Sequence, residues 1–189
     1  MSAQPALVTY ARQRDSSNKS RVAILAGAKS VISRVGNYQS NIADIAVSAQ
    51  VSKATIYNQF ADKAEMMESL VESEVIRLTE LALAATSRQE ALALLSTAIS
   101  QDLALRKLVE TDPSDIAKLV TITNHPIWVL AHQGIAKVFG ADSAASGVIL
   151  RWLIGQIGSP ITQDESVAQS KRLAATLFLS LIHISEPTR

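Results

Sequence analysis

One stretch, residues 40–60 (SNIADIAVSAQVSKATIYNQF), constrains the fold more than any other part of this chain of 189 residues. Its apolar residues fall at helical spacing in two short runs. Ile45 belongs to the buried face of the first helix, and Ile56 and Phe60 belong to that of the second. Val51 lies between the runs, where it can fill the angle between two crossing helices. The stretch predicts two short helices joined by a tight turn.

Each of these helices has a capping residue at its expected start. Ser40 and Ser52 can each accept a hydrogen bond from a backbone N–H that the first helical turn leaves unpaired. The second helix then exposes a set of polar side chains without an acidic member: Lys53, Thr55, Tyr57, Asn58 and Gln59. A short donor-bearing helix held by a partner helix is what reading the major groove requires. The stretch therefore predicts a helix-turn-helix that binds double-stranded DNA.

The charge of the chain is divided unevenly between its two parts. Residues 1–63 carry eight Lys/Arg against three Asp/Glu, whereas residues 64–189 carry ten against fourteen. A basic first third joined to an acidic remainder is typical of a polyanion-binding module attached to a body with another task. Chance variation among solvated surfaces is the alternative that this charge pattern leaves open.

Composition excludes several other classes of protein. Apolar residues make up 48% of the chain, which is too many for a disordered protein. No apolar run reaches the ~18 residues that a membrane span needs, so we expect no membrane partner. The chain has no cysteine, which excludes disulfides and thiolate chemistry and agrees with a cytoplasmic location.

Around the helix-turn-helix, the pattern predicts an all-α protein. Residues 1–19 show no helical stripe, and we expect a flexible basic arm. A helix should run from Ser20 to Gly36, which ends it in a left-handed conformation, so that residues 20–63 form a three-helix domain. Asp62 should cap a long amphipathic helix that starts at Lys63 and enters a second helical domain, residues 64–178.

Within that second domain, Gly, Pro and capping residues divide the chain into further helices. One pattern covers Gln89 to Leu108, and Pro113 and Pro126 each mark a new start. Further expected helices run from Pro126 to Gly140, from Asp142 to Gly158 and from Asp164 onward.

The helix-turn-helix resembles the N-terminal domain of the TetR family of transcriptional regulators. An apolar helix ending in Gly36 precedes VSKATIYNQFADK, and a long helix follows. The resemblance covers about residues 21–67. The positions that match the family's usual string are Ile45, Ala46, Ala49, Val51, Ser52, Thr55, Tyr57, Phe60 and Lys63.

Three positions depart from the family pattern. Gln50 replaces the turn glycine, and its Cβ disfavours a positive φ by roughly 1–2 kcal/mol. Ala54 replaces the glycine of the recognition helix, which favours the helix but keeps the backbone slightly farther from DNA. Gln59 replaces a histidine, so this position keeps a donor but cannot become charged.

The resemblance implies which side chains contact DNA. Those expected at phosphates are Ser40, Ser52, Thr55, Tyr57 and Lys63. Lys53 and Asn58 are our choices for base edges, because lysine donates to guanine and asparagine pairs with adenine. Packing of Tyr57 on the first helix is an alternative, and Gln59 is undecided between phosphate and solvent.

The resemblance also implies a homodimer formed by the last two helices and a pocket for a small apolar or amphipathic effector. The polar and aromatic candidates for that pocket are Asn124, His125, Trp128, His132, Trp152 and Gln156. Packing in the core or at its rim is the alternative for the first four, and a place in the dimer seam is the alternative for Trp152 and Gln156. Two histidines without a nearby third ligand fall short of a zinc site, so we expect no metal or other cofactor.

The function predicted from sequence is a ligand-responsive transcriptional regulator, more often a repressor in this family, that binds a palindromic operator as a dimer. No nucleophile motif, phosphate loop or pair of catalytic carboxylates is present, so we do not expect an enzyme. The alternative is a helical ligand- or partner-binding protein whose helix-turn-helix no longer binds DNA, which Gln50 and Ala54 favour.

The last eleven residues, LSLIHISEPTR (179–189), resemble the translation of a transposase-end sequencing adapter. We therefore assign no function to this segment.

Overall fold

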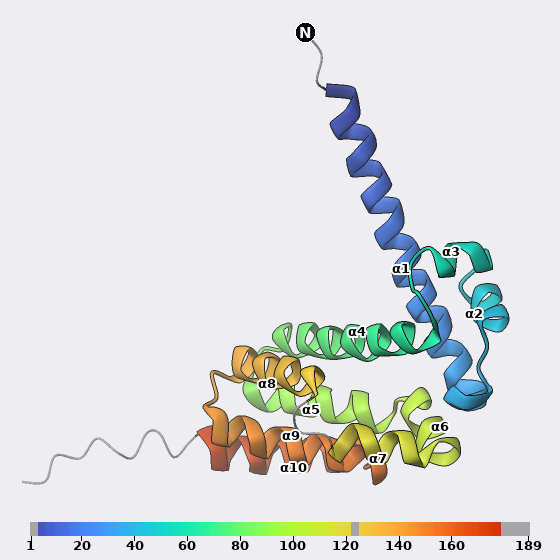
Figure 1. Cartoon of the computed structure of the whole chain (residues 1–189). Helices are drawn as coiled ribbons and strands as arrows, with labels where there is room; N and C mark the ends of the chain where they lie inside the picture. The colour runs from blue at the N-terminus through green and yellow to red at the C-terminus, as the bar shows by residue number, and fades with distance from the viewer. Residues whose placement is uncertain (1–3, 122–124, 179–189) are drawn as a thin grey trace, which may run out of the picture.

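The computed structural model describes residues 4–121 and 125–178, and every regular element in those ranges is an α-helix (Figure 1). The all-α prediction is confirmed. None of the described helices is both long and apolar enough to cross a lipid bilayer. Residues 122–124 and the expected adapter segment, 179–189, lie outside the described residues.

Helix α1 extends from Gln4 to Gln39 and projects well beyond the rest of the molecule (Figure 1). The expectation of a flexible arm over residues 1–19 is therefore corrected from Gln4 onward. The segment has no glycine before Gly27, and its one proline, Pro5, stands in the first turn, where proline is tolerated. Extending a helix that is already nucleated needs no further packing surface.

Gly36 interrupts α1 near its end with a φ of 80°, as the sequence predicted. A Cβ at this position would lie 2.1 Å from the hydroxyl of Thr111 and 2.5 Å from a carboxylate oxygen of Asp112. Glycine is therefore needed here both for its backbone conformation and for the close approach of a distant helix.

The first core joins α1 to three further helices. These are α2 (Ile42–Ser48), α3 (Lys53–Tyr57) and the first turns of α4 (Lys63–Leu83). Ile24 and Ile45 are fully buried at its centre, and Ile56, Phe60 and Met66 are exposed by 2% or less. Helices α1, α2 and α3 thus share one core with the start of α4.

The second core joins the remaining part of α4 to the helical body. The body contains α5 (Arg88–Ser100), α6 (Leu103–Thr111), α7 (Pro113–Thr121), α8 (Pro126–Phe139), α9 (Ser143–Gly158) and α10 (Gln163–Phe178). Leu92, Phe139 and Ile149 are fully buried in this core. Its helices lie roughly side by side across the molecule, as Figure 1 shows.

The expected helix from Gln89 to Leu108 is in fact two helices. Asp102 caps α6 by accepting hydrogen bonds from the N–H groups of Ala104 and Leu105. Leu103, which the periodicity assigned to the buried stripe, is 65% exposed. The change of direction at Asp102 brings α6 against α1, where Gly36 allows the close approach described above.

Candidate functional site

Helix α3 is held by a cap and by two buried side chains. The hydroxyl of Ser52 accepts a hydrogen bond from the N–H of Thr55 at 3.0 Å, which confirms the predicted cap. The two hydroxyls also lie 2.8 Å apart. Ile56 and Phe60 fix the opposite side in the first core. The orientation of α3 is therefore set by contacts that leave its outer face free.

That outer face carries most of the residues predicted to contact DNA. Lys53, Ala54 and Asn58 are exposed, and Thr55 is half-buried. Tyr57 is 58% exposed, which argues against the alternative that it packs on the first helix. The face therefore combines one cation, an amide and two hydroxyl groups on a single short helix.

Gln59 faces α1 instead of the outer face of α3. Its amide donates to the hydroxyl of Ser17 at 2.8 Å. Arg21 donates to the backbone carbonyl of Gln59 at 3.1 Å and to Ser69 at 2.7 Å, and its guanidinium lies 4.3 Å from the centre of the Phe60 ring. These contacts connect the end of the helix-turn-helix to α1. The side chain of Gln59 therefore makes an intramolecular hydrogen bond instead of facing phosphate or solvent.

Ser40 does not cap α2, and this prediction is corrected. Asn41 is the cap, and its side chain accepts a hydrogen bond from the N–H of Asp44 at 2.9 Å. Ser40 is 4% exposed, and its hydroxyl donates to the carbonyl of Asn37 at 2.7 Å. In this conformation the hydroxyl stabilises the turn between α1 and α2 and is not presented to a phosphate.

Lys63 likewise points into the molecule. Its ammonium donates to the carbonyl oxygens of Asn37 and Ser40, the second at 2.7 Å. Burial lowers the pKa of Lys63, while the charge of Asp112 acts in the opposite direction. The expectation of a phosphate contact is not supported by this geometry, because the ammonium donates to two carbonyl oxygens, one in the last turn of α1 and one in the turn after it.

The start of α4 is also closed to an anion. Asp62 caps it, as predicted, by accepting from the N–H of Glu65 at 2.8 Å. Glu65 accepts from the N–H of Ala61 at 2.6 Å in return. This reciprocal pair satisfies two backbone donors at the start of α4 and places two carboxylates where a phosphate was expected.

Asp112 is the partner that joins the last turn of α1, after Gly36, to the end of α6. Its carboxylate accepts from the backbone N–H groups of Asn37 and Tyr38, both at 2.9 Å, and from the hydroxyl of Thr111 at 2.6 Å. Burial alone would raise the pKa of Asp112, but these hydrogen bonds, together with Lys63, hold it below its usual value. We call Gly36, Asn37, Lys63 and Asp112 the α1–α6 junction.

The turn between α2 and α3 is built as the sequence predicted. Gln50 has a φ of 55° and is the only non-glycine residue with a positive φ in the described ranges. The turn also packs closely on α1, because a Cβ on Gly27 would lie 2.8 Å from both the Cβ and the N of Ala49. Helical periodicity did not predict that Gly27 allows this close approach. A glycine inside an apolar helical stripe is a sequence signal for such packing.

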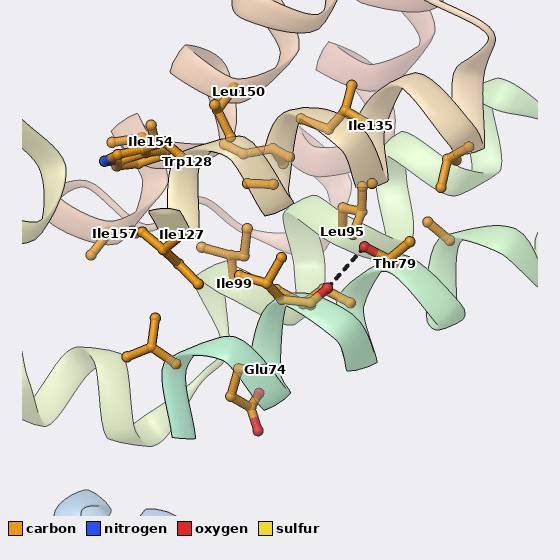
Figure 2. Close-up of a pocket in the computed structure, with 18 of the residues that line it drawn as sticks. Glu74, Thr79, Leu95, Ile99, Ile127, Trp128, Ile135, Leu150, Ile154 and Ile157 are labelled. Atoms are coloured by element: carbon orange, nitrogen blue, oxygen red, sulfur yellow. Dashed lines mark hydrogen bonds between the residues drawn. The ribbon is translucent and has the colours of Figure 1, made fainter. Parts of the chain in front are cut away.

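The second domain contains a cavity of about 180 Å³ between α4 and α8, which we call the apolar cavity. Aliphatic side chains converge on it, and the carboxylate of Glu74 points away (Figure 2). Glu74 instead pairs with Lys29 at 2.7 Å and Arg77 at 2.8 Å. The lining residues include Val71, Val75, Leu78, Leu95, Ile99, Leu119, Ile127, Trp128, Ala131, Ile135, Leu150, Leu153, Ile154 and Ile157.

A second cavity of about 230 Å³ lies next to the α1–α6 junction, and we call it the junction cavity. Its walls come from α1, α4, α6, α7 and the start of α8. They include Ile32, Asn37, Met67, Glu68, Leu70, Val71, Leu108, Asp115, Ile116, Leu119, His125 and Ile127. This cavity therefore contacts both domains.

Two of the predicted pocket residues line these cavities. Trp128 lines the apolar cavity, and His125 lines the junction cavity and caps α8. His132 and Trp152 line neither; the indole of Trp152 donates to Gln169 at 2.8 Å. Asn124 lies outside the described residues.

Gln156 is a core residue and not a pocket residue. Its carbonyl accepts from Ser96 at 2.8 Å and from Ser100 at 3.1 Å, and the hydroxyl oxygens of Ser96 and Ser166 lie 2.8 Å apart. These buried polar groups join α5, α9 and α10. The position of Gln156 on the same helix face as Trp152 did not distinguish this network from a cavity wall.

A family model described as "Bacterial regulatory proteins, tetR family" matches residues 24–70, which cover α2, α3 and the adjoining parts of α1 and α4. The N-terminal domain belongs to the TetR family. The TetR match includes Gly27, the turn at Gln50 and the capped start of α4. A search of curated protein sequences found no match to the chain.

Solved structures similar to this one extend the TetR likeness over the second domain. The TetR family repressor AlkX from Dietzia sp. strain DQ12-45-1b has a TM-score of 0.58 and 17% identity, over 83% of this chain and 94% of AlkX. The fatty acid degradation regulator FadR from Bacillus halodurans has a TM-score of 0.58 and 18% identity, over 83% of this chain and 93% of FadR. Salmonella enterica GusR has a TM-score of 0.57 and 16% identity, over 84% and 95%. At these low identities the TM-scores show a shared fold with these regulators over most of the chain.

Proposed function

We propose that the protein is a homodimeric transcriptional regulator, most readily a repressor, that releases its operator when an apolar or amphipathic effector enters the second domain. The exposed face of α3 carries the proposal, with Lys53 and Asn58 as the residues that read base edges. Tyr57, Thr55 and Ser52 would contact phosphates beside them. Ala54 would face the DNA between these side chains.

The apolar cavity supports an effector role for the second domain. Val71, Val75 and Leu78 of α4 line it, and the same helix begins in the DNA-binding domain. A molecule that displaces these side chains would tilt α4 and change the separation of two copies of α3. Docking in successive major grooves requires a separation of about 34–36 Å. AlkX is implicated in the biodegradation of n-alkanes and FadR regulates fatty acid degradation, which agrees with an apolar chain as the effector.

The dimer would form through α9 and α10. Val148 is 46% exposed and Val167 is 47% exposed, one on each of these helices. Two such helices from each protomer form the four-helix contact of an isologous dimer. We expect V148K/V167K to be monomeric by light scattering, and V129K, at a 55% exposed valine of α8, to remain dimeric.

Selection from a library of random duplexes tests the DNA-binding proposal. We expect a palindrome to be enriched, and its affinity to fall steeply with salt as phosphate contacts are lost. K53A/N58A should lose the preference for that palindrome over random duplex while keeping its helical circular dichroism, because both side chains are exposed. Lys137→Ala, an exposed lysine on α8, is the matched control. Equal affinity for every duplex at low salt would contradict the proposal.

A further inference from the structure

The apolar cavity and the junction cavity share part of their walls. Val71, Leu119 and Ile127 line both of them. Because these three aliphatic side chains belong to both walls, the two cavities adjoin, and one elongated molecule that displaces them would occupy both. The polar content of each cavity then determines which end of the molecule lies where.

The apolar cavity contains few polar groups that remain available. Glu74 is already paired with two cations, and the hydroxyl of Thr79 donates to the carbonyl of Val75 at 2.9 Å, as the dashed line in Figure 2 shows. The indole N–H of Trp128 is buried without a partner among the described residues. This cavity therefore suits a hydrocarbon tail.

The junction cavity, in contrast, presents acceptors that are not satisfied. The side-chain carbonyl oxygen of Asn37 is buried and has no hydrogen-bond partner in the described residues. Glu68 is exposed and makes no ion pair with any described residue. Asp115 accepts from the amide of Asn37 at 3.3 Å, and its carboxylate, 49% exposed, lies 3.8 Å from Lys118.

Among the described residues that line this cavity, His125 has a side chain that offers a donor to a guest. The Nδ1 atom of His125 accepts from the N–H of Ile127 at 3.3 Å, so that Nε2 carries the hydrogen of the neutral ring. Two carboxylates and an unpaired amide oxygen thus belong to residues that line the same cavity as one imidazole N–H. A carboxylate guest would meet repulsion here, whereas an ammonium would satisfy a buried acceptor and two negative charges.

We propose that the effector is a linear amphiphile with a cationic, hydrogen-bond-donating head such as a primary amine. Its tail lies in the apolar cavity, and its head lies in the junction cavity against Asn37, Glu68 and Asp115. The proposal rests on the proposed function, because it specifies the chemistry of the effector. It also places the head beside the last turn of α1, where Asn37 donates its backbone N–H to Asp112.

Binding of a matched series tests the head group. Dodecylamine, dodecanol and dodecanoic acid are titrated, below the concentrations at which they self-associate, into the full-length protein and followed by tryptophan fluorescence and calorimetry. We expect dodecylamine to bind at least about tenfold more tightly than dodecanoic acid, with dodecanol between them. Butylamine, too short to reach both cavities, should bind far more weakly than dodecylamine.

Charge-removing variants assign the preference to the proposed residues. E68Q/D115N should lower dodecylamine affinity by about tenfold and leave dodecanol affinity nearly unchanged. E72Q/D164N removes two exposed carboxylates that line neither cavity and should leave both affinities unchanged. Equal or tighter binding of dodecanoic acid, no binding of any probe, or an unchanged amine preference in E68Q/D115N would overturn the proposal.

Release of the selected duplex is measured separately, by fluorescence anisotropy. If dodecylamine binds with the expected preference and the duplex stays bound, the amphiphile site stands and the effector role under the proposed function fails. If the acid is bound more tightly and releases the duplex, the effector role stands and the head-group inference fails.

Discussion

The DNA-binding domain and the helical body solve the same packing problem in different ways. In the first, Ile24, Ile45 and Ile56 fill the core, and polar ties such as Gln59 to Ser17 fix the surface helices. In the second, long helices surround the apolar cavity of about 180 Å³, and the junction cavity of about 230 Å³ lies where the body meets the DNA-binding domain. A filled core holds one geometry, whereas a core with unfilled volume can change side-chain positions at lower cost. This difference suits a rigid DNA-binding domain joined to a second domain that changes conformation when an effector binds.

The α1–α6 junction is the place where these two regions meet, and Gly36→Ala is expected to have the largest effect on it. The new Cβ would require an unfavourable positive φ and would displace Asp112, costing about 3 kcal/mol of unfolding free energy in total. Chemical denaturation measures the change. Gly158→Ala, at a helix end where a Cβ meets no atom within 4 Å, should change stability by less than about 0.5 kcal/mol. Equal effects of the two substitutions would contradict a close-packed junction.

Asp112→Asn tests the charge at the same junction. The amide cannot accept as strongly from the N–H groups of Asn37 and Tyr38, and a loss of about 2 kcal/mol is expected at neutral pH. Because the pKa of Asp112 is lowered in the folded protein, its contribution is complete above the unfolded value and is lost as pH falls through the folded value.

The stability difference between wild type and D112N should therefore shrink on acidification, from about pH 5 downward. D115N, at a largely exposed carboxylate on the next helix, is the control and should show little of this dependence. A difference that stays constant down to pH 2 would show that the charge of Asp112 does not stabilise the junction.

Ala131→Leu tests whether the apolar cavity has room for additional side-chain atoms. Ala131 lines the apolar cavity, and leucine has nearly the same helix propensity as alanine. Added methyl groups that enter the cavity should stabilise the protein by about 1 kcal/mol and weaken dodecyl-probe binding. Ala136→Leu, at an exposed position of the same helix, should do neither. Destabilisation by A131L would indicate a body packed as tightly as the DNA-binding domain.

Gln50→Gly is expected to have the smallest effect and tests strain inside the rigid domain. Glycine adopts the φ of 55° freely but loses more entropy on folding, so we expect a net gain of about 0.5 kcal/mol. Ala54→Gly, the other departure from the TetR pattern, should instead cost about 0.5–1 kcal/mol in helix propensity. Thermal melts of the two variants measure whether stability rises or falls. A loss of stability in Q50G would mean that the side chain of Gln50 makes stabilising contacts in the turn.

The same contrast explains what the sequence could predict. Caps, turns and buried positions of the DNA-binding domain depend on neighbours within a few residues, so the roles of Ser52, Ile56 and Asp62 were predictable. Lys63 and Gln59 were assigned outward because their partners are 23 to 42 residues away along the chain. Helical periodicity gives the side of the helix from which a long side chain starts, but not the distant residue with which its polar end will form a hydrogen bond.

In the body, periodicity identified the helices but not the walls of the cavities. Trp128 and His125 were found because they differ chemically from their aliphatic neighbours. Leu78 and Leu153 line the apolar cavity with the same residue type that fills a core, so that only their position in three dimensions reveals the role. Gln156 was assigned to the pocket for the converse reason, since its buried partners Ser96 and Ser100 lie on another helix, α5, far away along the chain.

A distance between the two DNA-binding domains of the proposed dimer tests the central claim most directly. The chain has no cysteine, so that Val47→Cys, at a 79% exposed position of α2, accepts one spin label per protomer. With the selected duplex bound, a single narrow distance distribution is expected, and saturation with the dodecyl probe that binds most tightly should shift or broaden it. An unchanged distribution with the probe bound, or no dipolar coupling between labels, would contradict a dimer whose DNA-binding domains respond to the cavity.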